Sequence, residues 1–172
     1  NMEARRLVEQ AIGQAFRTSG HRWLSAITAR DYLFRQGGDS LMLAVRSQLA
    51  KSPRVDSLEA PLMSRLLRTR ALLGVRVDGW ERIKLEPTQA GRPYTTVRLS
   101  AALVDSTGRL LWTASGGETI EGQYRDPNQG VVGMKASGLS DQPMTNTAAV
   151  HAAFPWFSAL LSPVPVIHCI AF

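Results

Sequence analysis

Apolar side chains recur at helical spacing near the start of the chain. Between Glu3 and Thr18 they occupy positions i, i+1, i+4, i+5, i+8 and i+9, beginning at Leu7 and ending at Phe16. This spacing places them on one stripe of a helix, and Gly20 is suited to the left-handed conformation that ends it. The sequence therefore predicts an amphipathic first helix.

A short apolar run follows this helix. Residues 22–27 are rich in Trp, Leu and Ile and predict a strand. Thr28 is suited to cap a short helix that extends to about Arg35, because its hydroxyl can accept from an unpaired backbone N–H. Gly37 and Gly38 then end that helix.

Two further helices are predicted before residue 71. The first begins at Asp39 or Ser40 and closes before Pro53. The second begins at Asp56, where an acceptor side chain is followed three residues later by Glu59, a capping-box pattern. The apolar positions expected on these two helices are Leu41, Met42, Val45 and Leu49, then Leu58, Leu62, Leu66 and Leu67.

After Arg70 the apolar period changes from helical to alternating. Residues 71–83, 94–104 and 109–120 each alternate between apolar and polar or small positions, as expected of strands with one wet face. On the second of these segments Thr96, Arg98 and Ser100 share the polar side. The residues from Asp105 to Gly108 predict a hairpin turn. Three successive segments therefore predict an antiparallel meander.

These elements predict an α/β (α+β) fold. We expect a mixed, largely antiparallel sheet that contains the three-strand meander, with helices packed mainly on one face. The length of 172 residues fits a single domain, 1–172. Residues 121–146 are rich in Gly, Pro, Asn and Ser and predict a long loop within it. A helix is expected from Asn146 or Thr147, and the apolar tail 164–172 is broken by prolines and does not resemble a membrane span.

The net charge of +6 does little to define a partner. It comes almost wholly from arginine, since only Lys51, Lys84 and Lys135 are lysines. The arginines are scattered singly, often beside Asp or Glu, whereas a nucleic-acid binder concentrates its charge on one face or run. We therefore expect no nucleic-acid partner. Cys169 stands alone, so no disulfide within the chain can form.

Motifs that would announce catalysis are missing from the sequence. The three histidines (His21, His151 and His168) have no metal-binding spacing, and neither a serine nucleophile elbow nor a phosphate-binding glycine loop occurs. We predict no catalytic, cofactor-binding or metal-binding residues and no cofactor. One alternative stays open: a small hydrolase or transferase whose acidic residues converge only in three dimensions. The acids on or near the strands are Glu81, Glu86, Glu118 and Glu121.

Aromatic and arginine residues alternate along the meander. Trp, Tyr and Arg dominate the anchors of protein interfaces, so this pattern predicts a protein-contact surface on the sheet. Trp80 has the same parity as Arg76 and Asp78 in a regular strand, which places it on that surface. Core packing and cross-strand pairing are the other explanation, above all for Trp112. The candidate contact residues are Trp80, Arg76, Arg82, Tyr94 and Tyr124.

Residues 66–123 carry a recognisable pattern. A helix ending in Leu66 and Leu67 leads into the strand that begins at Ala71, and residues 99–104 lead into a hairpin of the form Asp, two small residues, Gly, a hydrophobic pair and Trp, here Asp105 to Trp112. This pattern resembles a group of bacterial envelope proteins: the curli-secretion lipoprotein, the lipoprotein activators of penicillin-binding proteins, and the amino-terminal domain of the Tol-system translocation protein. Such domains usually begin with a hydrophobic strand ahead of the first helix, which this chain lacks. Either truncation removed that strand or residues 164–170 fill its place, and the second is our hypothesis.

The resemblance implies a non-enzymatic protein-binding or assembly domain of the cell envelope. Its expected location is periplasmic or outer-membrane associated, with another envelope protein or a second copy of the chain as partner. Membrane attachment is expected only through a lipid anchor. The amino terminus is polar and carries no visible signal peptide, and Asn1 before Met2 resembles the remnant of an expression tag. We therefore expect any export signal to lie upstream.

Overall fold

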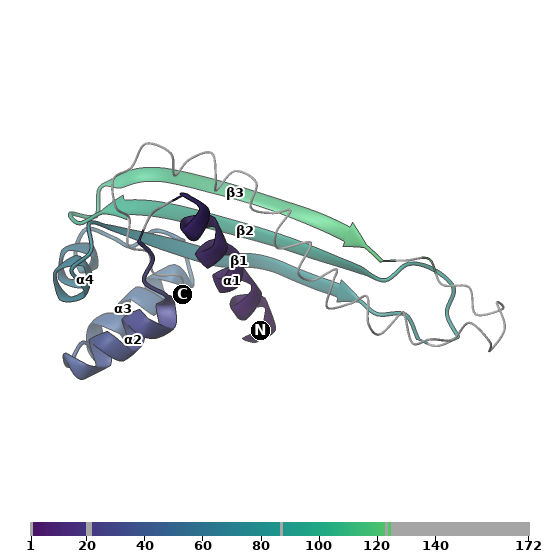
Figure 1. The fold of residues 1–172 in the computed structure, drawn as a ribbon, viewed down its shortest axis with the longest axis horizontal. Coiled ribbons are helices and arrows are strands. Elements are labelled where there is room, and N and C mark those ends of the chain that lie inside the picture. Colours follow the sequence, from purple (N-terminus) through teal and green to yellow (C-terminus); the bar gives the residue numbers. More distant parts are fainter. Residues whose placement is uncertain (1, 20–21, 87, 123, 125–172) are drawn as a thin grey trace.

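The computed structural model of the chain describes residues 2–19, 22–86, 88–122 and 124. Within them, three strands follow the helices and form one antiparallel sheet in the order β1-β2-β3 (Figure 1). The predicted α+β fold and its meander are thereby confirmed. The elements are α1 (Met2–Ser19), α2 (Ala26–Arg35), α3 (Asp39–Leu49), α4 (Glu59–Leu67), β1 (Ala71–Ile83), β2 (Tyr94–Asp105) and β3 (Leu110–Glu121).

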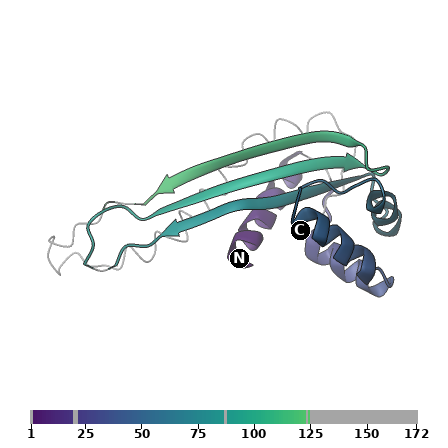
Figure 2. The ribbon, with the colours of Figure 1, turned by 180° about the vertical axis from the view of Figure 1, so that it is seen from behind.

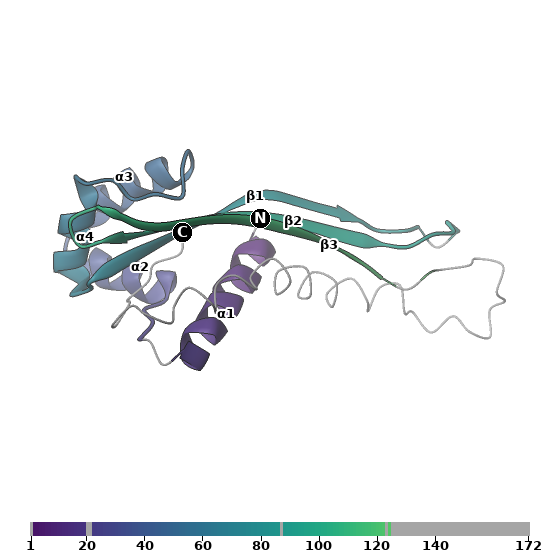
Figure 3. The same cartoon turned by 90° about the horizontal axis from the view of Figure 1, so that it is seen from above.

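Helix α1 covers one face of the sheet. Its predicted apolar stripe is buried, and Ile12 and Phe16 are fully inaccessible to solvent. These side chains form a core cluster with alternate residues of β1 and β2, among them Leu73, Val97 and Leu99. Figure 3 shows α1 on the side of the sheet opposite α3. Burial of this stripe holds the helix across the strands, because each large apolar side chain removed from water contributes about 2 kcal/mol.

The other three helices form a second core at one end of the strands. Their buried side chains pack together with Leu72 of β1 and Val104 of β2. Leu72 and Val104 alternate along their strands with residues that face α1, so they lie on the opposite face of the sheet. Seen from the front and from behind, the strands continue well past this helical group (Figures 1 and 2). The helices therefore cover only part of the sheet's length on this side.

The prediction of a strand at residues 22–27 is wrong. The structure begins α2 at Ala26, within that run. Ser25, not Thr28, is the N-cap: its side-chain oxygen accepts a hydrogen bond from the Thr28 backbone N–H at 3.1 Å. The Ala26 N–H donates to the Glu9 side chain at 3.0 Å, which ties the start of α2 to α1. These two bonds satisfy free N–H groups at the start of the helix, and the capping signal overrides the strand propensity.

Two of the leucines predicted on the helix that begins near Asp56 are largely exposed to solvent. Leu58 is 76% exposed and Leu62 is 50% exposed, whereas Ala60, Met63 and Leu67 are buried. The start of the helix sets this rotation, because Asp56 Oδ1 accepts from the N–H groups of Leu58 and Glu59.

The side chain of Gln48 holds this helix start against α3. Its Nε2 donates to Asp56 Oδ2 at 2.6 Å and to Glu59 Oε2 at 2.7 Å. The pKa of Asp56 is lowered, chiefly by its side-chain hydrogen bond with Glu59 and next by the Leu58 N–H. The predicted capping role of Asp56 is thus confirmed, with Gln48 as an additional partner.

The hairpin turn between β2 and β3 is organised by the Asp105 carboxylate. It accepts from the Thr107 hydroxyl at 2.6 Å, from the Thr107 and Arg109 N–H groups, and from Arg109 Nε. These bonds, led by that of the Thr107 hydroxyl, lower the pKa of Asp105 from 3.8 to about 2. Gly108 has φ of 83°, a left-handed conformation that glycine adopts without strain. The predicted turn is confirmed, including the need for glycine.

A loop after α3 crosses β1 at Gly74. A Cβ on Gly74 would lie 1.8 Å from the Pro53 carbonyl oxygen, so no larger residue fits there. Two residues further along, the Arg76 guanidinium donates to the Lys51 carbonyl. Gly74 was expected on a wet strand face, but the loop covers it. On the face of the sheet opposite α1, the described helices and loops therefore cover β1 only as far as about Arg76.

The return strand contains an irregularity that sequence alternation did not predict. Leu103 pairs with Trp112, whereas its neighbour Val104 pairs with Leu110, so Leu111 is an extra residue. Such a β-bulge reverses which side of the sheet each following residue faces. The regular alternation predicted for residues 109–120 would put Leu110 and Trp112 on one face; the bulge places them on opposite faces, and Trp112 packs against the α1 core.

Several predicted features lie outside the described residues. These are most of the loop 121–146, the helix expected from Asn146 or Thr147, the strand expected at 164–170, the three histidines and Cys169. Among the helices that the structure describes, none has the length and apolar character needed to span a membrane.

Candidate binding hollow on the sheet

A second β-bulge, in β1, divides the sheet's residues between its two faces. Val77 pairs with Leu99 and Gly79 pairs with Arg98, which leaves Asp78 as the extra residue. Before the bulge the odd-numbered residues of β1 face α1. After it the even-numbered ones do, since Trp80 pairs with the core residue Val97. Trp80 and Arg76 therefore face opposite sides of the sheet, although a regular strand would place them together.

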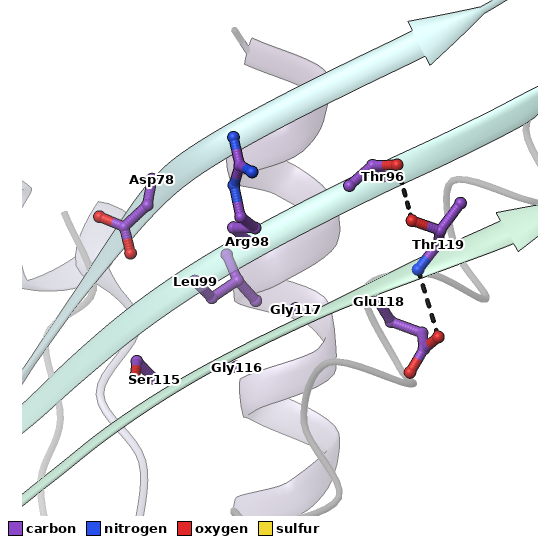
Figure 4. Close-up of a pocket in the computed structure, with 9 residues that line it drawn as sticks. All are labelled: Asp78, Thr96, Arg98, Leu99, Ser115, Gly116, Gly117, Glu118 and Thr119. Carbon is purple, nitrogen blue, oxygen red and sulfur yellow. Dashed lines mark hydrogen bonds between the residues drawn. The ribbon is translucent and has the colours of Figure 1, made fainter.

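An open hollow of about 600 Å³ lies beside this bulge. Figure 4 looks onto the sheet with α1 behind the strands, so the hollow is on the face that α1 does not cover. It spans all three strands. Its lining residues are Asp78, Thr96, Arg98, Leu99, Ser115, Gly116, Gly117, Glu118 and Thr119.

Arg98 occupies the centre of this hollow between two glycines. Its cross-strand partner on β1 is Gly79 and its partner on β3 is Gly117. A Cβ on Gly79 would lie 2.8 Å from Arg98 Nε, and a Cβ on Gly117 would lie 2.8 Å from Arg98 Cγ. The missing side chains therefore leave a slot in which the arginine lies across the sheet, and Figure 4 shows its guanidinium extending toward β1.

The Arg98 guanidinium is exposed and has no partner among the described residues. Neither a hydrogen bond nor an ion pair joins it to any of them. Asp78, an acid that lines the same hollow, is already held by Arg76, with Arg76 Nε 2.5 Å from Asp78 Oδ1. Glu118 Oε1 accepts from the Thr119 N–H at 3.3 Å. A guanidinium carries five N–H donors, and here they are available to a ligand.

Hydroxyl groups line the same hollow on β2 and β3. The Thr96 and Thr119 hydroxyls hydrogen-bond to each other at 2.8 Å across β2 and β3. Because only one hydroxyl hydrogen is used in such a pair, the other can donate to a bound oxygen. The exposed Ser115 lies on the same side, opposite Ser100 in the register. The hollow thus combines hydroxyl groups and the Arg98 cation with the carboxylates of Asp78 and Glu118.

Further along the same face, Tyr94 and Glu81 form a polar pair. The Tyr94 hydroxyl donates to Glu81 Oε1 at 3.3 Å. The pKa of Tyr94 is raised, first by desolvation and then by the negative charge and hydrogen bond of Glu81. The phenol therefore remains a neutral donor at physiological pH.

The structure separates the five candidate contact residues. Arg76 and Tyr94 lie on the face that carries the hollow. Trp80 packs against the α1 core, and Arg82, two residues on, pairs with the buried Thr95 on that same side. Tyr124 lies beyond the end of β3 and is 61% exposed. The two faces are distinct surfaces, so these residues do not form one patch.

Sequence reasoning did not single out the centre of the hollow. Arg98 was noticed only as one of several arginines between the aromatics, and its polar side of β2 was predicted with Thr96 and Ser100. The available signal was the pair Gly79 and Gly117, whose significance depends on the strand register. Gly116 and Gly117 lie within β3 and do not open a helix.

The acidic residues with altered pKa lie elsewhere. Asp56 and Asp105 both have lowered pKa values, and each one holds a helix start or a turn. Within the part of the chain that the structure describes, no group of three or more His, Cys, Asp or Glu residues is placed to hold a metal ion.

No protein family matches this sequence, and no curated protein does. Among solved structures, the chain is similar to a candidate lipoprotein from Caulobacter crescentus CB15, with 14% identity and a TM-score of 0.38, over 69% of this chain and 93% of that one. It is also similar to lipoprotein GNA1162 from Neisseria meningitidis, with 18% identity and a TM-score of 0.32, over 71% of this chain and 93% of that one.

Proposed function

We propose that this chain is a non-enzymatic domain of the bacterial cell envelope that binds another envelope protein. The carrying observation is the face of the sheet beyond Arg76, which described helices leave uncovered and which presents the Arg98 guanidinium, for which the described residues supply no partner. Arginine is enriched where proteins bind one another, so an exposed arginine on a long sheet face is suited to anchor a protein interface.

The hairpin motif supports the envelope assignment. Residues 66–123 resemble the group of bacterial envelope proteins named above, and the Asp and Gly of this motif have defined structural roles here. Asp105 fixes the turn, and Gly108 allows it to lie against the segment before α4. The proposed location is the periplasm or the inner surface of the outer membrane, with attachment through a lipid anchor outside these residues.

No observation on the described residues favours the hydrolase or transferase alternative. That hypothesis needs two carboxyl groups that converge on a reacting atom. In the hollow, the Asp78 carboxylate is already paired with Arg76. We therefore propose binding and assembly as the role of this surface.

Photo-crosslinking in the native bacterium tests this function. A photoreactive amino acid is placed at Thr119, in the hollow, and separately at Asp31, an exposed residue of α2. We expect a discrete adduct with an envelope protein from position 119 and none from position 31. Adducts of the same pattern from both positions, or none from position 119, would contradict a specific binding surface. An adduct between two copies of this chain would identify self-association as the interaction.

A further inference from the structure

The Arg98 guanidinium, which has no partner among the described residues, lies in a slot between its two cross-strand partners, Gly79 on β1 and Gly117 on β3. A Cβ on Gly79 would meet the flexible end of Arg98, and a Cβ on Gly117 would meet Arg98 Cγ and the Val97 backbone oxygen, both at 2.8 Å. An arginine side chain carries considerable conformational entropy, so a slot that restricts it reduces the entropy lost when a ligand binds. The slot therefore limits where the side chain can lie, while its guanidinium end stays able to move.

The charges around this slot define the ligand. Asp78 is neutralised by Arg76, which also donates to the Lys51 carbonyl. Glu118 lines the hollow, and its Oε1 accepts from the Thr119 N–H. The cation of Arg98 and the carboxylate of Glu118 thus remain without an ion-pair partner among the described residues, and the Thr96–Thr119 pair and Ser115 add hydroxyl donors to the hollow. Donors of this kind favour an oxygen anion.

We propose that this hollow binds a carboxylate of an acidic segment of the partner protein, with Arg98 as its anchor. The planar guanidinium matches a carboxylate with two parallel N–H···O bonds, which a point charge such as lysine cannot reproduce. The hollow is open and spans three strands, so it accommodates a peptide side chain presented from outside. This inference rests on the proposed protein-binding function and names the chemistry of its partner.

Three substitutions separate the roles of charge and geometry. Arg98→Gln removes the cation, and Arg98→Lys keeps the charge but loses the fork. Gly79→Ala keeps Arg98 but places a Cβ 2.8 Å from its Nε and 3.0 Å from its terminal nitrogen, which displaces the flexible end of the side chain. Arg30→Gln is the matched control, because Arg30 is an exposed arginine on α2 that pairs only with its neighbour Asp31 in the described structure.

The test is a nuclear magnetic resonance titration of the full chain with a capped triglutamate peptide. A capped triglutamine peptide and inorganic phosphate serve as comparison probes. We expect saturable shifts of the Gly79, Arg98 and Gly117 backbone amides with triglutamate and none with triglutamine. Affinity should fall about tenfold in Arg98→Gln and severalfold in Arg98→Lys and Gly79→Ala, and stay unchanged in Arg30→Gln.

The outcomes distinguish this proposal from the broader function. The carboxylate site would be overturned if triglutamate shifted the backbone amides of exposed arginines throughout the chain, or if Arg30→Gln lowered the affinity for triglutamate as much as Arg98→Gln does. Binding of phosphate in the hollow without binding of triglutamate would also overturn it, because the ligand chemistry would differ. If crosslinking from position 119 persists while triglutamate does not bind, the carboxylate proposal fails and the protein-binding function stands. If crosslinking fails as well, both proposals fall.

Discussion

Gly108, in the hairpin turn, lies so close to Ser57 that a Cβ on the glycine would be 2.4 Å from the Ser57 Cα. The same Cβ would be 2.9 Å from the Asp56 carbonyl oxygen, and Arg54 donates to the Gly108 carbonyl at 3.4 Å. The turn between β2 and β3 is thus docked on the segment that starts α4. The glycine of the hairpin motif serves this contact in addition to the turn itself.

Gly108→Ala should therefore destabilise the fold more than the backbone conformation alone requires. Gly37 is the matched control, since it also has positive φ (70°) but no atom within 4 Å of a Cβ. We expect Gly37→Ala to lower the free energy of unfolding by about 1 kcal/mol and Gly108→Ala to lower it by about 3 kcal/mol. Urea denaturation measures both. Equal losses would show that the docking contact contributes nothing.

The carboxylate of Asp105 should make stability depend on pH. Its pKa in the folded chain, about 2, lies below its ordinary value of 3.8. A lowered folded-state pKa stabilises the fold above about pH 4, and this contribution, on the order of 1 kcal/mol after solvent screening, is lost as the pH falls toward about 2.

Asp105→Asn tests this dependence. The variant should be less stable than the natural sequence at pH 7, and the difference in free energy of unfolding should shrink by pH 2. Asp31→Asn is the control, because Asp31 forms only an exposed pair with Arg30 in which both side chains are 52% exposed. A difference for Asp105→Asn that stays constant from pH 7 to pH 2 would refute the assignment.

Two glycines of β1 should respond differently to the same substitution. At Gly74 a Cβ would meet the Pro53 backbone oxygen at 1.8 Å, whereas at Gly79 it would meet the mobile end of Arg98. We expect Gly74→Ala to lower the free energy of unfolding by about 3 kcal/mol and Gly79→Ala to lower it by about 1 kcal/mol. The Arg98 side chain at Gly79 can move aside, whereas the Pro53 backbone at Gly74 cannot. Thermal unfolding of the two variants measures the difference. Similar losses at both positions would mean that the loop does not press on β1 at Gly74.

The helices and strands were largely predictable because their patterns extend over many residues. The strands predicted at 94–104 and 109–120 are observed as Tyr94–Asp105 and Leu110–Glu121. Local capping was harder to predict. The run 22–27 has strand propensity, but Ser25 and the distant Glu9 supply hydrogen bonds that start a helix inside it.

The candidate site was less predictable because it depends on register. Extra residues at Asp78 and Leu111 shift the pairing between neighbouring strands. The alternation of residues within one strand does not reveal such a shift. Sequence reasoning therefore placed Trp80 with Arg76. The slot around Arg98 needs Gly79 and Gly117 on either side, a relationship that joins three strands and appears only once they are paired.

The bulge at Asp78 determines which residues share the hollow, and its most direct test is the environment of the Trp80 ring. Nuclear Overhauser contacts from this ring should reach the methyl groups of Val97, its partner on the α1 side of the sheet. Contacts from the ring to the side chains of Arg76 or Tyr94 would instead place Trp80 on the polar face. That result would contradict the separation of the two faces and the binding surface built on it.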